Sequence, residues 1–551
     1  MAMYFRVKKS GRHEYLQIVE SVREAGKVHQ RVLGSLGRAD RLRESGDLEK
    51  LLKNGLRHCR EGAVWEAYRK GETRIETIRR IGAELVFGRL WEETGIGPIV
   101  REMAASSRHG FEVERAVYLT VMHRLFGGGS DRQAERWRED YWLEGTQELQ
   151  LHHLYRAMTF LGEATQSPES PVRGAVRARK DRIEEELFER RRDLFTEVEM
   201  VFFDTTSLYF EGEGGTGLGE RGHSKDHRPD LAQMVVGMVV DAEGWPICTE
   251  LWPGNTADVS TLIPVVNRLR RRFRLQRMCV VADRGLFSQT TLKVLEENDP
   301  VVSYIVGARM RRQKEVSTTV LADEGPWEEV YPERSKAKDP APLKVKEVTV
   351  GQRRYVVCLN EEERRKDAHD REAILEGLRK QLKKGDKSLV GNKGYRRYLK
   401  SRKGGFAIDE QSVQREARFD GVWVVRTNTD LPAAQVALTY KHLWAVEALF
   451  RTTKDILQTR PIYHRTAENI RGHVFCSFLA LILKCELEAR LRKNAQPWEW
   501  SEVIRGLNAL QEVTLRSQGK RFVLRNDLSA HALQAIRAAS VALPPALRPL
   551  N

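Results

Sequence analysis

The stretch MVFFDTTSLYF at residues 200–210 contains an apolar run closed by an aspartate, and MCVVADRG at 278–285 repeats the pattern. Two more strand-like segments, 232–241 and 246–253, and the helix-like segment 260–273 lie between them. Three strands followed by alternating helix and strand predict a mixed sheet with helices packed against it. The centre of the chain is therefore expected to be an α/β fold.

The two apolar runs end in Asp204 and Asp283, and a third carboxylate, Glu447, lies in the helix-like segment 440–457. An aspartate at a strand end is by itself often a turn former or a helix N-cap. Glu447 stands among apolar residues, where an unpaired charge is costly, so a metal ion or a basic partner is expected beside it. Three carboxylates that meet from separate elements form an oxygen site for Mg²⁺ or Mn²⁺, and two such ions can drive displacement at a phosphate.

Basic and aromatic residues accompany Glu447 along the expected helix. Tyr440 lies seven residues before Glu447, and Lys454 lies seven residues after it. Arg451 lies four residues after Glu447, about one helical turn. This spacing predicts one helical stripe on which a carboxylate is flanked by groups that contact a phosphate backbone. The alternative is an ordinary ion pair between Glu447 and Arg451, four residues apart on one helix.

The composition favours a polyanionic partner. The chain has 551 residues, a formal net charge of +16 and 41% hydrophobic residues, which allow several packed domains with an excess of Lys and Arg. A basic surface without nucleic acid, or one that binds acidic membranes, is the alternative. Six cysteines without a CxxC pair fit a reducing compartment and argue against a classical zinc site. With no signal-peptide pattern and no apolar run of membrane-spanning length, a cytosolic protein is expected.

Changes of pattern along the chain predict five segments. Residues 1–165 combine an antiparallel meander with helices, and 180–311 form the first part of the α/β core. Residues 312–418 are predicted to be an inserted subdomain, rich in strands and basic residues, after which the core returns at 419–490. The last segment, 491–551, is predicted to be helical.

Several other motifs carry weaker signals. GEGGTG at 212–217 matches a dinucleotide-binding pattern, but no apolar helix follows it, so it is interpreted as a loop. The polar stretch after it contains Lys225 and Arg228, which could grip DNA or lie at a solvated hairpin tip. His464, His473 and Cys476 lack zinc-ligand spacing and are interpreted as structural.

Taken together, these blocks resemble the DDE transposases of bacterial cut-and-paste insertion sequences, in the branch with a β-rich insertion between the second Asp and the Glu. The resemblance rests on DTTSLYF, RGHSKDHRPDLAQ, LWPGNTAD, VVADRGLFS, the stretch from YKHLWAVEALFRTTKDIL to RPIYHRTAENIRGH, and YLQIVESVREAGKVHQRVLGSLGR near the N-terminus. It spans most of the chain and is weakest in the final fifty residues. It implies a ribonuclease-H-like core in which Asp204, Asp283 and Glu447 bind Mg²⁺, with Mn²⁺ able to substitute.

The resemblance also implies partners. The family pattern on the third-carboxylate helix is matched by Tyr440, Glu447 and Lys454, but Leu443 stands where the family has Arg. Lys441 or Arg451 could replace its phosphate contact. The expected partners are double-stranded DNA, as terminal inverted repeats and as target, and a second copy of the chain in a dimeric complex. The N-terminal region and the basic insertion would bind the element ends, in the bacterial cytoplasm at the nucleoid.

The implied reaction is metal-dependent hydrolysis at the ends of an insertion sequence, followed by transfer of the 3′-hydroxyl to target DNA. Two alternatives stay open: a metal-dependent nuclease without strand transfer, and an inactive transposase-derived DNA-binding protein. The presence of all three carboxylates argues against the second, while Leu443 lends it support.

Overall fold

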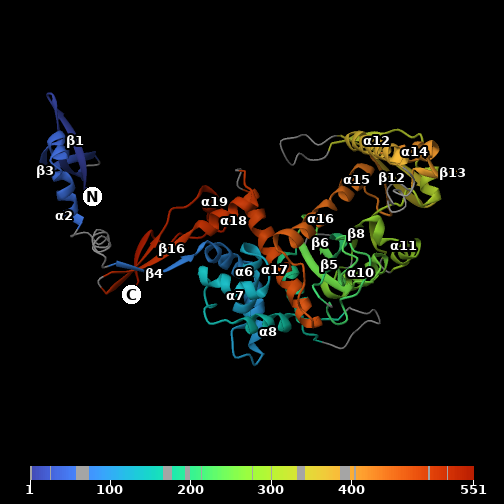
Figure 1. Cartoon of the computed structure of the whole chain (residues 1–551), viewed down its shortest axis with the longest axis horizontal. Helices are drawn as coiled ribbons and strands as arrows, with labels where there is room; N and C mark the ends of the chain where they lie inside the picture. The colour runs from blue at the N-terminus through green and yellow to red at the C-terminus, as the bar shows by residue number, and fades with distance from the viewer. Residues whose placement is uncertain are drawn as a thin grey trace. The chain divides into compact units, whose positions relative to one another are not determined.

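The computed structural model describes residues 3–24, 27–56, 73–165, 176–192, 199–212, 214–275, 277–298, 301–331, 342–384, 397–402, 405–493, 497–517 and 519–550 (Figure 1). The chain divides into two compact units. The first comprises residues 1–85, 140–142 and 497–551, and the second comprises 86–139 and 143–496. Each unit is described by itself.

The first unit begins with the meander that the alternating sequence predicts. Strands β1 (Met3–Ser10), β2 (His13–Glu24) and β3 (Lys27–Arg38) pair in order and antiparallel. The two-residue turn between β1 and β2 uses Gly11 at φ +60°, a conformation that glycine adopts without steric cost. Two short helices follow, α1 (Ala39–Glu44) and α2 (Asp47–Leu56).

The C-terminal segment corrects a prediction. Residues 491–551 were expected to be helical, but helices α18 (Trp500–Ala509) and α19 (Ala530–Ala538) alternate with three strands. These are β16 (Gln511–Ser517), β17 (Lys520–Arg525) and β18 (Leu547–Leu550), which join β4 (Thr73–Arg80) in a four-stranded sheet. The physical reason is visible in QEVTLRS and KRFVLR, which alternate polar and apolar residues around a turn at Gly519, the signature of a hairpin.

The second unit is built on a mixed sheet of nine strands, as predicted for the centre of the chain. In sheet order they are β10 (Glu328–Val330), β11 (Leu343–Val350), β12 (Arg353–Asn360), β15 (Val422–Thr427), β9 (Ser303–Gly307), β8 (Met278–Ala282), β5 (Glu199–Tyr209), β6 (Gln233–Val240) and β7 (Pro246–Pro253). The ladders β5–β8 and β8–β9 are parallel, and the others are antiparallel. Crossover helices between the parallel strands explain why this part of the sequence alternates strand and helix.

Helices cover both faces of this sheet (Figure 1). On one face, α10 (Leu262–Phe273) and α11 (Gln289–Glu296) close an apolar core with Val201 and Phe203 of β5. The intervening Phe202 points to the other face, where its ring lies 5.9 Å from that of His442. That face carries α15 (Ala433–Lys441), α16 (Trp444–Arg451) and, against β7, α17 (Ala467–Arg492). The period-two alternation of β5 therefore decides which side chains face α15 and α16.

A group of helices completes the second unit around α17, which is buried along most of its length. It packs against α6 (Val113–Phe126) and α8 (Leu151–Gly162). The remaining members are α4 (Arg89–Glu93), α5 (Ile96–Ala105), α7 (Asp131–Trp137) and α9 (Arg179–Arg191). Within the described parts of the chain, no helix combines the length and apolar character needed to cross a membrane.

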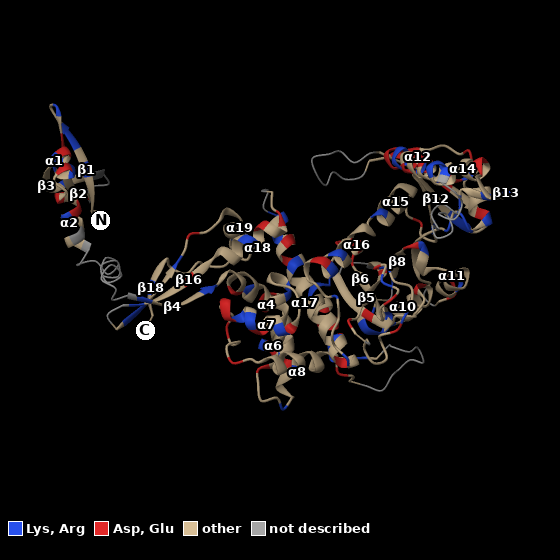
Figure 2. Cartoon of the chain, viewed as in Figure 1, with Lys and Arg blue, Asp and Glu red and all other residues tan. Residues whose placement is uncertain are grey.

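The segment 312–418 is less separate than the sequence predicts. Its strands β11 and β12 extend the main sheet, because β12 pairs with β15 along six residue pairs. The rest of the segment contains α12 (Glu361–Lys384), the hairpin β13 (Leu399–Arg402) and β14 (Gly405–Ile408), and α14 (Glu410–Ala417) around a small core of its own. α12 carries both acidic and basic residues (Figure 2).

Candidate active site

Strand register places Asp204 beside Asp283. In the parallel ladder of β5 and β8, Phe203 pairs with Ala282, so the next residues along the two strands are the two aspartates. Because Phe203 faces the α10 side of the sheet, Asp204 faces the opposite side, toward α16. Asp283 directly follows β8 and begins the short 3₁₀ turn η4 (Arg284–Leu286).

Glu447 reaches the same place from α16. Asp204, Asp283 and Glu447 line one cavity of about 230 Å³, together with Glu363, Trp423, Tyr440, Lys441, Leu443 and Trp444. Burial raises the pKa of Asp204 to about 6, and the negative charges of Asp283 and Glu447 act in the same direction. The opposing influences are the Lys225 ammonium and the backbone N–H of Thr205, which donates to Asp204 Oδ1 at 2.7 Å. The three carboxylates thus repel one another across a shared space.

Tyr440 fixes the orientation of Asp283. The side chain of Tyr440 is half-buried, and its phenol donates a hydrogen bond to Asp283 Oδ1 at 3.0 Å. Gly307, the last residue of β9, makes this approach possible, because a Cβ there would lie within van der Waals distance of the phenol oxygen. The sequence identified Tyr440 but gave no reason to single out Gly307.

The segment around Glu447 is not the single helix that the spacing predicts. α15 ends at Lys441, α16 starts at Trp444, and the π-helical turn η7 (Thr452–Ile456) follows. At the junction Leu443 N–H donates to Tyr440 O, three residues back, which is the tighter 3₁₀ pattern and interrupts the α-helix. Leu443 itself is buried and lines the cavity. Tyr440 and Glu447 consequently reach one cavity from two different helices.

Lys454 lies on η7 and is not among the residues that line the cavity. Its ammonium contacts the buried Asp226 at 2.8 Å, and Arg460 contacts the same carboxylate oxygen at 2.5 Å. Arg451 is exposed. The alternative pair between Glu447 and Arg451 does not form, since neither residue has an ion-pair partner in the described ranges. The predicted stripe therefore separates into groups with different surroundings.

Lys225 and Arg228 also have different surroundings from each other. The Lys225 ammonium donates to Thr205 O at 2.6 Å and to Thr205 Oγ1 at 2.7 Å, and it pairs with Asp258 Oδ2 at 3.1 Å. Its three donors are therefore occupied next to Asp204. Arg228, by contrast, is exposed and binds Asp230 in a bidentate manner at 3.0 and 2.9 Å. Asp258 closes the block LWPGNTAD, the sequence signal that could have identified it.

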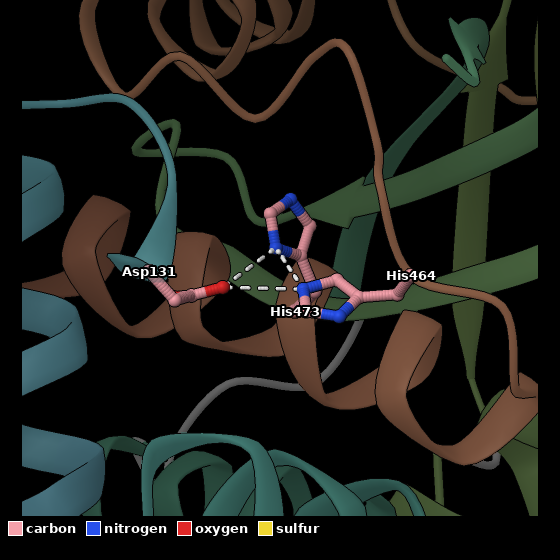
Figure 3. Close-up of side chains that lie close together, drawn as sticks. All are labelled: Asp131, His464 and His473. Carbon is pink, nitrogen blue, oxygen red and sulfur yellow. Dashed lines mark hydrogen bonds and ion pairs between the residues drawn. The ribbon is translucent and has the colours of Figure 1, made fainter. Parts of the chain in front are cut away.

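Asp131, His464 and His473 form a second polar cluster in the unit (Figure 3). His464 Nε2 lies 3.2 Å from both Asp131 Oδ2 and His473 Nδ1. His473 Nε2 bonds Thr459 O at 3.0 Å and is therefore the protonated nitrogen, which leaves Nδ1 as the acceptor. Arg124 Nη2 lies 2.8 Å from that Nδ1. Because this guanidinium occupies the lone pair that a metal would need, the cluster is better described as a buried hydrogen-bond network.

The cavity around Asp204 suits a divalent cation far better. Its donors are carboxylate oxygens, which Mg²⁺ and Mn²⁺ prefer. The raised pKa of Asp204 reflects burial and negative charge that a bound cation would offset. Tyr440, which is not itself one of the three carboxylates, already holds one of them, Asp283, in place.

Comparison with known proteins defines the class. The family model described as Transposase DDE domain matches residues 199–483, which include all three carboxylates of the cavity. Since that match covers more than half of the chain, the protein belongs to the DDE transposases, enzymes that use divalent metal ions. The model described as IS1634 family transposase, N-terminal domain, matches residues 5–70 and relates the chain to the transposases of insertion sequences.

The other comparisons are more distant. A solved structure described as "Cryo-EM structure of piggyBac transposase synaptic complex with hairpin DNA (SNHP)" is 12% identical, over 78% of each chain, with a TM-score of 0.34. A likeness of that size adds nothing to the assignment. No curated protein sequence matches the chain.

Proposed function

We propose that this transposase cuts DNA at the ends of its insertion sequence and joins the freed 3′-hydroxyl to target DNA. The observation that supports it is the convergence of Asp204, Asp283 and Glu447 on one cavity from β5, β8 and α16. We propose further that these carboxylates hold Mg²⁺, with Mn²⁺ able to replace it, and that the mixed sheet is a ribonuclease-H-like core. Residues 180–311 and 419–490 contribute its central strands and the three carboxylates, and the insertion 312–418 adds β10, β11 and β12 at one edge of the sheet.

A cation held by these carboxylates would neutralise charge on the phosphate and lower the pKa of the attacking water or hydroxyl. The surrounding residues organise the carboxylates. Tyr440 orients Asp283 by its hydrogen bond, and Lys225 ties Thr205, the neighbour of Asp204, to Asp258. Lys441, on the cavity wall, is placed to contact a phosphate oxygen.

The chemistry proceeds in two displacements of the same kind. In the first, water attacks a phosphodiester at the element end, and the products are a 3′-hydroxyl and a 5′-phosphate. In the second, that 3′-hydroxyl attacks a target phosphodiester and releases a target 3′-hydroxyl. One cavity can serve both because each step needs only an oxygen nucleophile aligned with a phosphate.

DNA contacts are proposed on several surfaces. The buried Leu443 offers no phosphate contact, so Lys441 and the exposed Arg451 take the role of the missing family Arg. Residues 1–165 and the basic insertion bind the element ends, and two copies of the chain hold two ends together. Lys454, Lys225 and Arg228 already have protein partners and contribute less to backbone contacts than their charges imply.

The test is cleavage and joining of a duplex that carries the inverted repeats flanking the gene, in Mg²⁺ or Mn²⁺. Wild type is compared with Asp283→Asn, Asp204→Asn and Glu447→Gln. Metal-dependent cutting and joining that each variant abolishes is the expected result. Cutting without joining would leave a nuclease, and tight binding without cutting by wild type would leave a DNA-binding protein. Full cleavage by Asp204→Asn or Glu447→Gln would contradict the assignment of the carboxylates.

A further inference from the structure

A second cavity of the same unit, of about 260 Å³, is lined by an unusual number of arginines. Its walls come from the end of α4, the C-terminal turn of α9, the turn between β6 and β7, and α17. The lining residues are Glu93, Thr94, Leu187, Arg190, Arg191, Trp245, Ile482, Glu486 and Arg490. No role in the proposed reaction involves this cavity.

Its two carboxylates share one arginine of the cavity. Arg490 Nη1 contacts Glu93 at 2.8 Å, and Arg490 Nε contacts Glu486 at 2.7 Å. Arg490 and these two glutamates thus form one bridged group of net charge −1. The charges of Arg190 and Arg191 exceed that remainder, so the cavity has a net positive lining.

Among the described residues, Arg191 makes two long ion pairs and no hydrogen bond. Its guanidinium carbon lies 3.6 Å from the centre of the Trp245 ring, a stacking distance. Stacking uses the face of the guanidinium and leaves the N–H groups at its edge, which match two oxygens of a phosphate. Its nearest carboxylates are at 3.7 and 3.8 Å, in Glu486 and Glu243, too long for hydrogen bonds.

Arg190 is also available. Across the described residues it has neither a hydrogen-bond nor an ion-pair partner. Its guanidinium lies against Gly95, where a Cβ would be 2.5 Å from Nη1, and Gly95 has φ +86°. A residue with a side chain at position 95 would displace the guanidinium, so the backbone is shaped to receive it. Two guanidinium groups with free donors at one cavity are the chemistry that binds a phosphate.

The cavity is close to the carboxylates. Gly244 directly precedes Trp245 of the arginine cavity, and a Cβ at Gly244 would lie 3.6 Å from the Cβ of Ala445. Ala445 directly follows Trp444, which lines the carboxylate cavity. The Cα atoms of Trp245 and Trp444 are therefore within about 15 Å of each other. This corresponds to roughly four base pairs of duplex, at about 3.4 Å per step.

We propose that this arginine cavity binds a backbone phosphate of the DNA that occupies the carboxylate cavity, a few nucleotides from the bond that is cut. The identity of that DNA rests on the proposed function. The binding of a phosphate does not rest on the proposed function, because it needs only the two guanidinium groups. It requires neither a metal ion nor cleavage of the DNA.

The experiment measures the affinity of the full chain for a fluorescent 40-base-pair duplex, without divalent metal, over a range of salt concentrations. Each phosphate contact contributes about 0.9 to the slope of log affinity against log salt. The double variant Arg190→Ala/Arg191→Ala is expected to lower that slope by about 0.9, the value for one phosphate. Each single variant is expected to lower it by part of that amount and to weaken binding several-fold at moderate salt. Arg182→Ala is the matched control, since Arg182 is an exposed arginine on the same helix that does not line the cavity.

Thermal unfolding of each variant checks that it is folded. If both single variants have the wild-type slope, or change it no more than Arg182→Ala does, the arginine cavity does not bind DNA and the inference is wrong. Failure of the proposed function is a separate result, because it appears as wild-type binding without metal-dependent cutting. The salt slope still decides the role of the cavity in that case.

Discussion

Tyr440 donates a hydrogen bond to Asp283, at 3.0 Å, across 157 residues of sequence. The bond joins the end of α15 to the end of β8, two elements whose relation determines the shape of the carboxylate cavity. Burial and the neighbouring Asp283 raise the pKa of Tyr440 above its ordinary value, so the phenol stays protonated and acts as the donor. One side chain thus couples helix packing to the orientation of a carboxylate that we propose to be catalytic.

Tyr440→Phe removes this bond and leaves the ring. We expect cleavage to fall roughly tenfold, because a hydrogen bond to a charged group is worth about 1.5 kcal/mol and every 1.36 kcal/mol at the transition state is a factor of ten. The measurement is the single-turnover cleavage rate in Mg²⁺. Tyr463→Phe is the control, since Tyr463 is 60% exposed and does not line the cavity. Equal rates in the two variants would show that the bond has no catalytic value.

Gly307→Ala tests the same contact from the other side. The new methyl group would overlap the phenol oxygen of Tyr440, so we expect a loss of about 1–3 kcal/mol in the free energy of unfolding. The double variant with Tyr440→Phe lacks that oxygen and should recover part of the loss, because neighbouring substitutions are not additive. Denaturant titrations of the four proteins measure the coupling. Gly285→Ala, with nothing within 4 Å of its Cβ position, is the control, and strict additivity would contradict the contact.

Lys454 and Arg451 are predicted to behave in opposite ways, although both were candidates for DNA binding. Lys454→Met leaves Asp226 to Arg460 alone and should destabilise the protein by about 1–3 kcal/mol while the salt dependence of DNA binding stays unchanged. Arg451→Gln removes an exposed charge, so the salt slope should fall by about 0.9 with stability unchanged. Denaturant titrations measure the stability of both variants, and DNA-binding titrations measure their salt slopes. A reduced salt slope for Lys454→Met would show that Lys454 contacts DNA.

Features that depend on local sequence could be predicted here, whereas features that depend on tertiary contacts could not. The apolar runs around Asp204 and Asp283 predicted strands, and their ends were enough to expect carboxylates at one edge of a sheet. The break between α15 and α16 was not predictable, because a run with helical spacing continues through Leu443 and only tertiary packing tightens it. The strands of the C-terminal segment were missed although QEVTLRS and KRFVLR carry a local signal. Partners such as Asp226 for Lys454 come from loops distant in sequence, where no pattern points to them.

Acid stability offers a prediction from a histidine outside the cavity. His123 of α6 is 2% exposed, and burial lowers its pKa to about 4 from an ordinary value near 6.5. Between these values the unfolded chain binds a proton that the folded chain excludes, so the free energy of unfolding decreases as the pH falls from about 6.5 to 4. His473, whose pKa burial lowers to about 3, acts in the same direction.

His123→Phe keeps an aromatic ring against Trp137 and removes the titrating group. Between pH 7 and pH 5 the wild-type free energy of unfolding should therefore decrease by about 2 kcal/mol more than that of the variant. Urea titrations at the two pH values measure the difference, and any constant cost of the larger ring cancels. His152→Gln, at an exposed position, should follow the wild type. If His123→Phe also follows it, His123 is protonated in the folded protein, and its burial does not exclude the charge.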